Sequence, residues 1–291
     1  MEHVGQWIST VDSWVWGLWM IVLLVGTGVY LTARLCLIQA RLFIHGFRAI
    51  RGDFDSPDDK GDISHFRTLA AVLSATVGTG NIAGVATAIA AGGPGALVWM
   101  WLTAVVGMTT KYAESLLADR YRVFRPDGSA AGGPMYVLER GLGWRWAGVL
   151  FAVFAVLASF GIGNMVQANS VADALNSAFD VPRHLSGVIM AALAGIVILG
   201  GIKRIAAVAA TVAPFMCVAY ILGGLVILVM NASAVPHTFL FINQDAFTPT
   251  AAVGGFAGAT VASAMRWGVA RGVFSNEAGL GSHGTCGGTH E

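Results

Sequence analysis

Residues 76–81 read Thr-Val-Gly-Thr-Gly-Asn and lie within an otherwise apolar stretch, residues 66–91. Each of the two glycines costs a helix interior about 1 kcal/mol relative to alanine. The side-chain oxygens of the threonines and of Asn81 compete with the helical backbone hydrogen bonds. The segment therefore predicts a helix that is interrupted near its centre, with free backbone N–H and C=O groups that could bind a small polar ligand or a cation.

Residues 269–282 show the same change from apolar residues to Ser, Asn, Glu and Gly. Ser275 is expected to be the N-cap of a following half-helix, with Glu277 in its first turn. An acidic residue at membrane depth is a functional candidate by default. The alternative is that Glu277 only neutralises the positive end of the helix, and under either interpretation it belongs to the architecture of a site.

The elements that carry these segments are membrane spans. Of the 291 residues, 56% are hydrophobic and only 11% are charged, whereas a soluble domain has about 25% charged residues. Apolar runs long enough to cross a bilayer recur along the chain, which indicates an all-α membrane protein. The predicted spans are residues 14–36, 66–91, 95–117, 147–176, 184–201, 205–230 and 255–274.

Lysine and arginine fall mainly on alternate connections: those after the first span, between the third and fourth, and between the fifth and sixth. The connections on the other side hold only Arg183. By the positive-inside rule, the N-terminus lies outside and the chain crosses the cytoplasmic membrane several times. Residues 66–91 then run from inside to outside, and residues 255–274 run in the opposite direction.

Two interrupted spans of opposite direction predict a binding site at mid-membrane depth, because lipid tolerates opened backbone only where protein buries it or water reaches it. Discontinuous helices of this kind hold substrate and coupling ion in many secondary transporters. A channel or a non-transporting membrane scaffold is the alternative. The net charge is +1 with no basic block, so no nucleic acid partner is expected.

An enzyme is not expected, because no paired acid and base or metal cluster lies at the end of a span. No P-loop is present that would indicate an ATP-driven pump. Three residues near the end of the chain could ligate zinc by residue type, but they lie in a glycine-rich tail, which argues against a metal site: His283, Cys286 and His290.

Long motifs at residues 76–101, 111–114, 131–143 and 266–282 resemble the alanine or glycine:cation symporter family. The resemblance implies the leucine-transporter-like fold of the amino acid–polyamine–organocation superfamily, with two inverted five-helix repeats and one extra N-terminal helix. It divides the chain into residues 1–65 (extra helix and cytoplasmic connection), 66–230 (first repeat) and 231–291 (outside connection and the start of the second repeat).

The resemblance also implies sodium-coupled symport of small neutral amino acids, chiefly L-alanine and glycine, by alternating access. Na⁺ is the expected coupling ion, with H⁺ as the alternative, and no organic cofactor is expected. A zwitterion needs donors for its carboxylate and acceptors for its ammonium group. N–H groups at the start of the outer half-helix suit the carboxylate, and an aromatic ring suits the methyl group.

On this basis the expected substrate contacts are Thr79, Gly80, Asn81, Gln167, Phe274, Ser275 and Asn276. Carbonyl and hydroxyl oxygens are expected to hold Na⁺, from Ala75, Thr76, Gly78 and Ser275. Lys111 and Glu114, three residues apart, are expected to form an ion pair or a gate, and Glu277 to have a structural role.

Gln167 has a second interpretation. It lies three residues after Asn164 in the fourth span, so the two amides share a helix face and could serve only as helix–helix hydrogen bonds. We favour substrate contact for Gln167, because the implied fold places this span beside the central cavity.

The match to the family's motifs ends at Ser282, and the polar tail does not continue the family's inner half-helix. We therefore expect the second repeat to be truncated and the 291 residues alone not to transport. Na⁺-dependent alanine uptake into liposomes that contain only these residues would contradict this expectation.

Overall fold

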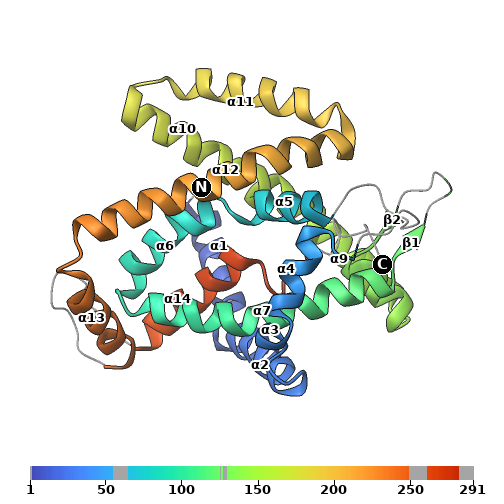
Figure 1. Cartoon of the computed structure of the whole chain (residues 1–291), viewed down its shortest axis with the longest axis horizontal. Helices are drawn as coiled ribbons and strands as arrows, with labels where there is room; N and C mark the ends of the chain where they lie inside the picture. The colour runs from blue at the N-terminus through green and yellow to red at the C-terminus, as the bar shows by residue number, and fades with distance from the viewer. Residues whose placement is uncertain (1, 55–64, 125, 127–129, 249–260, 282–291) are drawn as a thin grey trace. The chain divides into compact units, whose positions relative to one another are not determined.

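The computed structural model describes the whole chain except residues 1, 55–64, 125, 127–129, 249–260 and 282–291. The described residues are mostly helical (Figure 1). The elements are α1 Glu2–Val15, α2 Leu18–Arg34, α3 Ile38–Arg41, α4 Phe43–Arg51, α5 His65–Thr76, α6 Thr79–Gly92, α7 Ala96–Arg120, β1 Val123–Phe124, β2 Ala130–Ala131, α8 Pro134–Tyr136, η1 Val137–Gly141, α9 Arg145–Ala158, η2 Ser159–Met165, α10 Val166–Phe179, α11 Arg183–Ile198, α12 Gly201–Met230, α13 Val235–Phe247 and α14 Val261–Asn276.

The chain forms two compact units. The first unit comprises Met1–Leu42, Gly80–Ala113 and Ile221–Leu280. The second comprises Phe43–Thr79, Glu114–Tyr220 and Gly281–Glu291. The boundary between the units falls within the interrupted second span, between Thr79 and Gly80.

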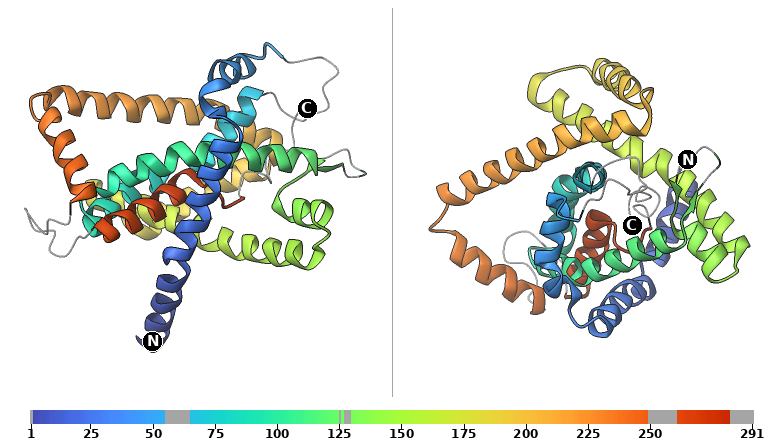
Figure 2. Two further views of the ribbon diagram at one scale, coloured as in Figure 1. Left: turned by 90° about the horizontal axis from the view of Figure 1, so that it is seen from below. Right: turned by 45° about the vertical axis from the view of Figure 1, so that its right-hand side comes forward.

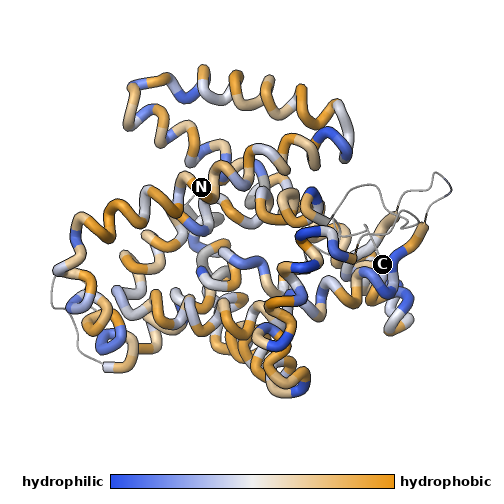
Figure 3. The backbone as a smooth tube through the Cα atoms, in the orientation of Figure 1, coloured by the Kyte–Doolittle hydropathy of each residue, from blue (hydrophilic) through white to orange (hydrophobic). Residues whose placement is uncertain are grey.

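Four helical stretches of the described residues are long and apolar enough to cross a membrane: Gly5–Arg34, Phe66–Gly92, Arg145–Phe179 and Lys203–Met230. Each overlaps a predicted span, and α7, α11 and α14 overlap the other three. At most 11% of the most apolar window of each stretch is buried in the protein, and apolar residues follow one another along the helices in Figure 3. Surfaces this apolar are suited to lipid and not to water.

The predicted interruption of the second span is confirmed. Helix α5 ends at Thr76 and α6 begins at Thr79, so Val77 and Gly78 belong to neither helix. The Val77 N–H still donates to the Leu73 carbonyl, at 2.8 Å. The break is therefore short, and the helical hydrogen bonds resume only after Gly78.

The fourth span has an irregularity that the sequence analysis did not predict. Between α9 and α10 the chain adopts a π-helix, η2. Single π-helical turns inside α-helices often occur at functional sites. Here the π-helix contains Asn164 and ends two residues before Gln167.

Helices α2, α7 and α14 pack together in the first unit. Ile21, Val269 and Val273 form a buried cluster, and α14 approaches α7 closely at Gly268. A Cβ atom at Gly268 would lie 2.5 Å from the Ala96 carbonyl oxygen. Small residues at such a crossing allow the backbones of membrane helices to approach each other.

The turn between α6 and α7 is held by α13, which follows α12 after a short turn (Figure 2). The Asp245 carboxylate accepts a hydrogen bond from the Gly95 N–H at 2.8 Å. The Trp99 indole N–H donates to the Ala246 carbonyl at 3.2 Å. A helix thus occupies the connection after the sixth span, and it caps the start of α7.

In the second unit, α10 and α11 form a helical hairpin. Asp180 adopts a left-handed conformation, with φ of 54°, at the end of α10. Strands β1 and β2 form a small antiparallel ladder. The motif at residues 131–143 contains α8 and η1.

Gly268→Ala should destabilise the protein by about 1–3 kcal/mol, because the added methyl group has no room beside α7. Gly224→Ala is the matched control, since a Cβ atom there has nothing within 4 Å; in a helix interior it should be neutral or stabilising by up to about 1 kcal/mol. Thermal unfolding of both variants in detergent checks this. Equal stability of the two variants would show that α14 does not approach α7 as described.

Candidate functional site

The first break is contacted by Gln167 within the second unit. The Thr79 N–H, the first of α6, donates to the Gln167 Oε1 atom at 3.2 Å. A Cβ atom at Gly78 would lie 3.0 Å from the Gln167 Nε2 atom, so glycine allows the amide to reach the backbone. The structure therefore brings together three predicted site residues from two spans.

Two of the predicted Na⁺ ligands lie at the end of α5. The Thr76 hydroxyl donates to the Val72 carbonyl at 2.9 Å. Ala75 is exposed. Because the last carbonyls of a helix have no partner within that helix, this helix end offers oxygen atoms of the kind that cations bind.

The second break lies at the end of α14 in the first unit, and here one prediction was wrong. Ser275 is in the last turn of α14 and is not the N-cap of a later helix. Glu277 follows the helix end with φ of 53°, in the left-handed conformation that closes many helices. The polar residues lie at the end of α14, and the expected half-helix falls outside the described residues.

Lys111 closes this helix end from α7. Its Nζ atom donates to the Glu277 carbonyl at 2.9 Å. A cation is favourable there because the C-terminal end of a helix carries partial negative charge. The Asn276 Oδ1 atom accepts from the Ala278 N–H at 2.9 Å, so the turn is held from both sides. Glu114, the predicted partner of Lys111, is half-buried further along α7.

The start of α6 lies against the end of α14, as the predicted site requires. A Cβ atom at Gly80 would lie 3.2 Å from the Phe274 ring and 3.6 Å from the Ser275 Cα atom. Any side chain larger than hydrogen at position 80 would press on the ring. Gly80, Phe274 and Ser275 are therefore neighbours within one unit.

Among the buried amide atoms of the first unit that have no hydrogen-bond partner in the described residues, two belong to predicted site residues: the Asn81 Oδ1 and the Asn276 Nδ2 atoms. Buried polar atoms are nearly always paired, so each exception needs an explanation. One atom is an acceptor and the other a donor, and both belong to predicted site residues at the two breaks. They are available to a ligand that offers both a donor and an acceptor.

Gly107 is a residue that the sequence analysis missed. A Cβ atom there would lie 3.0 Å from the Asn276 Nδ2 atom and 3.2 Å from the Ala278 Cβ atom. Its only signal in the sequence is a glycine within an apolar span, which is common at helix crossings in membranes. In this protein it leaves the space that the Asn276 amide occupies.

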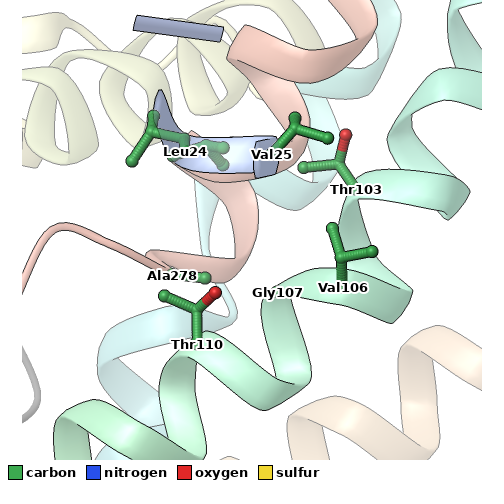
Figure 4. A pocket seen from close by; sticks show the side chains of 8 residues that line it. Leu24, Val25, Thr103, Val106, Gly107, Thr110 and Ala278 are labelled. Atoms are coloured by element: carbon green, nitrogen blue, oxygen red, sulfur yellow. The ribbon is translucent and has the colours of Figure 1, made fainter. Parts of the chain in front are cut away.

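A small hollow lies beside Gly107 between α2, α7 and α14 (Figure 4). Leu24, Val25, Val106 and Val273 give it apolar walls, and Thr103 and Thr110 supply hydroxyl groups. Only about 10 Å³ is open to the centre of a water molecule, which is about the room that one water needs. An amino acid does not fit there.

No group of three or more His, Cys, Asp or Glu side chains that could hold a metal ion occurs among the described residues. His283, Cys286 and His290 lie outside them. Amide, carbonyl and hydroxyl oxygens occur at each of the two helix ends. Such atoms suit a small polar solute or a hard monovalent cation better than a transition metal.

Long apolar helices, one of them interrupted beside a polar side chain, define a multi-pass helical membrane protein. The chain belongs to the sodium:alanine symporter family, whose model matches residues 1–290. The resemblance seen in the sequence motifs is thereby confirmed.

Curated relatives agree with this assignment. The chain is 51% identical to the sodium/alanine symporter AgcS of Methanococcus maripaludis, over 94% of this chain and 61% of the relative. It is 40% identical to a putative sodium/proton-dependent alanine carrier of Bacillus subtilis, over 96% and 56%. It is 41% identical to a probable sodium/glutamine symporter of the same organism, over 97% and 57%. The chain thus spans about three fifths of the length of these relatives.

Lys111→Met should destabilise the protein by about 1.5–3 kcal/mol, the range for a lost hydrogen bond to a charged group. Lys111→Arg should recover part of the loss, because it keeps a cation at the helix end. Lys203→Met, at an exposed position in α12, is the control and should leave the unfolding temperature unchanged. Thermal unfolding in detergent measures all three, and an unaffected Lys111→Met protein would exclude this helix-capping role.

Proposed function

We propose that this protein serves sodium-coupled symport of small neutral amino acids, chiefly alanine and also glycine, across the cytoplasmic membrane. The family assignment supports this proposal, as do relatives named as a sodium/alanine symporter and as an alanine carrier. Since the chain spans only part of each relative, the activity proposed is that of the whole gene product.

The unpaired atoms at the breaks carry the proposal. The Asn81 Oδ1 atom can accept a hydrogen bond from an ammonium group, and the Asn276 Nδ2 atom can donate one to a carboxylate. A zwitterionic amino acid would satisfy both, and satisfying buried polar atoms recovers about 1–3 kcal/mol for each. Phe274, which lies against Gly80, offers an apolar surface to the methyl group of alanine.

The remaining substrate contacts are proposed at Thr79, Gln167 and Ser275. The Gln167 amide already binds the Thr79 N–H, so it would release or share this donor when a carboxylate arrives. The proposed Na⁺ ligands are oxygens of Ala75, Thr76, Gly78 and Ser275. Lys111, Glu114 and Glu277 have structural or gating roles in this proposal.

The proposed fold is the inverted-repeat, leucine-transporter-like arrangement. In it, α5 and α6 form the first helix of one repeat, and α14 begins the first helix of the other. The broken second span and the irregular end of α14 support this assignment, as does the opposite direction of the two spans inferred from charge. The proposed segments stay as residues 1–65, 66–230 and 231–291, with the N-terminus outside and transport by alternating access.

Proton coupling is the alternative for the driving ion, since one relative is named as sodium/proton-dependent. Uptake of labelled alanine into cells that express the whole gene separates the two. Sodium coupling predicts that uptake saturates with alanine and falls to background when choline replaces Na⁺ at constant pH. Unsaturated flux would favour a channel, and uptake that follows a proton gradient without Na⁺ would favour the proton.

Gln167→Ala and Phe274→Ala should each weaken alanine binding by about 10-fold, the effect of losing one polar contact or one apolar wall. Gln6→Ala and Phe160→Ala are matched controls at exposed positions and should bind alanine normally. Binding of labelled alanine by the purified gene product in Na⁺ gives the affinities. Unchanged affinity in both site variants would overturn the proposed pocket.

A further inference from the structure

Arg271 is a charged residue held between two aromatic rings on α14. Its guanidinium carbon lies 5.8 Å from the centroid of the Trp267 ring and 5.8 Å from the centroid of the Phe274 ring. Residues four before and three after a given position share its helix face. The two rings therefore flank the guanidinium along the axis of α14 and stabilise its charge through their π-faces.

This guanidinium has no hydrogen bond or ion pair with any residue that the structure describes. Other arginines differ: Arg122 pairs with Asp119 at 2.8 Å, and Arg183 pairs with Asp173 at 2.9 Å. A guanidinium has five N–H donors. The two aromatic rings do not offer these donors an oxygen acceptor, as a carboxylate would. A half-buried arginine in a predicted span, without an acid, is a functional candidate.

The face of α14 that carries Arg271 is the face that meets α6. A Cβ atom at Gly92 would lie 2.8 Å from the Trp267 Cβ atom, and one at Gly80 would lie 3.2 Å from the Phe274 ring. Arg271 is three residues before Phe274, about 4.5 Å along the helix axis. In the proposed orientation this places it on the outer side of Phe274.

We propose that Arg271 binds the carboxylate of the incoming amino acid on the outer side of Phe274, before the substrate reaches Gly80 and Asn276. This inference rests on the proposed function and adds a specificity residue to it. A guanidinium pairs with a carboxylate through two parallel hydrogen bonds, which a solute without a carboxylate cannot form. The two rings hold the guanidinium in place before the substrate arrives.

The test compares alanine with alaninamide, which keeps the ammonium and methyl groups but lacks the carboxylate. In Arg271→Gln, we expect the KM for alanine uptake to rise about 10-fold or more, the effect of losing a charge-assisted hydrogen bond. The inhibition constant of the cationic alaninamide should stay the same or fall, because a positive charge has been removed. A rise in both constants by the same factor would indicate a merely structural role and overturn the inference.

Arg266→Gln is the matched control. Arg266 is exposed on the same helix and makes no ring contact among those described, so both constants should match those of the unaltered protein. Arg271→Lys keeps the charge but loses the paired donors, and should raise the alanine KM several-fold with alaninamide unaffected. If the glutamine variant does not reach the membrane, the lysine variant decides in the same way, and an unchanged alanine KM overturns the inference.

This experiment distinguishes a failure of the proposed symport function from a failure of the proposed role of Arg271. Absence of Na⁺-dependent alanine uptake by the unaltered gene product would overturn the proposed function and the role of Arg271 with it. Normal uptake by the unaltered protein, with the same alanine KM in Arg271→Gln, would overturn only the role of Arg271.

Discussion

The structure depends on one constraint: a backbone N–H or C=O group in lipid must find a partner inside the protein. Both breaks open such groups, and in each case a side chain from a distant part of the chain meets one of them. The Thr79 N–H meets the Gln167 amide, and the Glu277 carbonyl meets the Lys111 ammonium. Helices that would be costly to interrupt in isolation are thus interrupted where a polar side chain is available.

Close approach of helices makes these contacts geometrically available. In lipid, helices associate through van der Waals packing and not through the hydrophobic effect, so small residues set the distance between them. Gly80 admits the Phe274 ring, Gly107 admits the Asn276 amide and Gly268 admits α7. The same glycines that weaken helix propensity therefore position the polar groups beside the breaks.

Local sequence was sufficient to predict the spans and the position of the first break, because hydropathy over about 20 residues and glycine placement are local signals. Ser275 shows the limit of that approach. The polar residues around it could start a helix or end one. In the structure they end α14, and Glu277 follows in a left-handed conformation. The end of α14 also contacts residues that are distant in the sequence, and a local sequence pattern does not encode such contacts.

The same limit applies to the partners of individual residues. Lys111 and Glu114, three apart, predict an ion pair along one helix, whereas the hydrogen bond from the Lys111 ammonium to a carbonyl 166 residues later in the chain has no signal in the local sequence. The π-helix before Gln167 was also unexpected, although glycines at 161 and 163 weaken regular α-helix there. These features arise from three-dimensional contacts. The types of residue involved could be predicted from the sequence, but the residue that each one contacts could not.

The two breaks differ in the charge that meets them, and this difference bears on where a cation can bind. The Glu277 carbonyl accepts from the Lys111 ammonium at 2.9 Å and from the Leu280 N–H at 3.3 Å. Both lone pairs of that oxygen are then in use, and a fixed positive charge beside it repels a second cation. The first break has a neutral amide as its partner. By charge alone, the end of α5 is therefore the more favourable of the two helix ends for a cation.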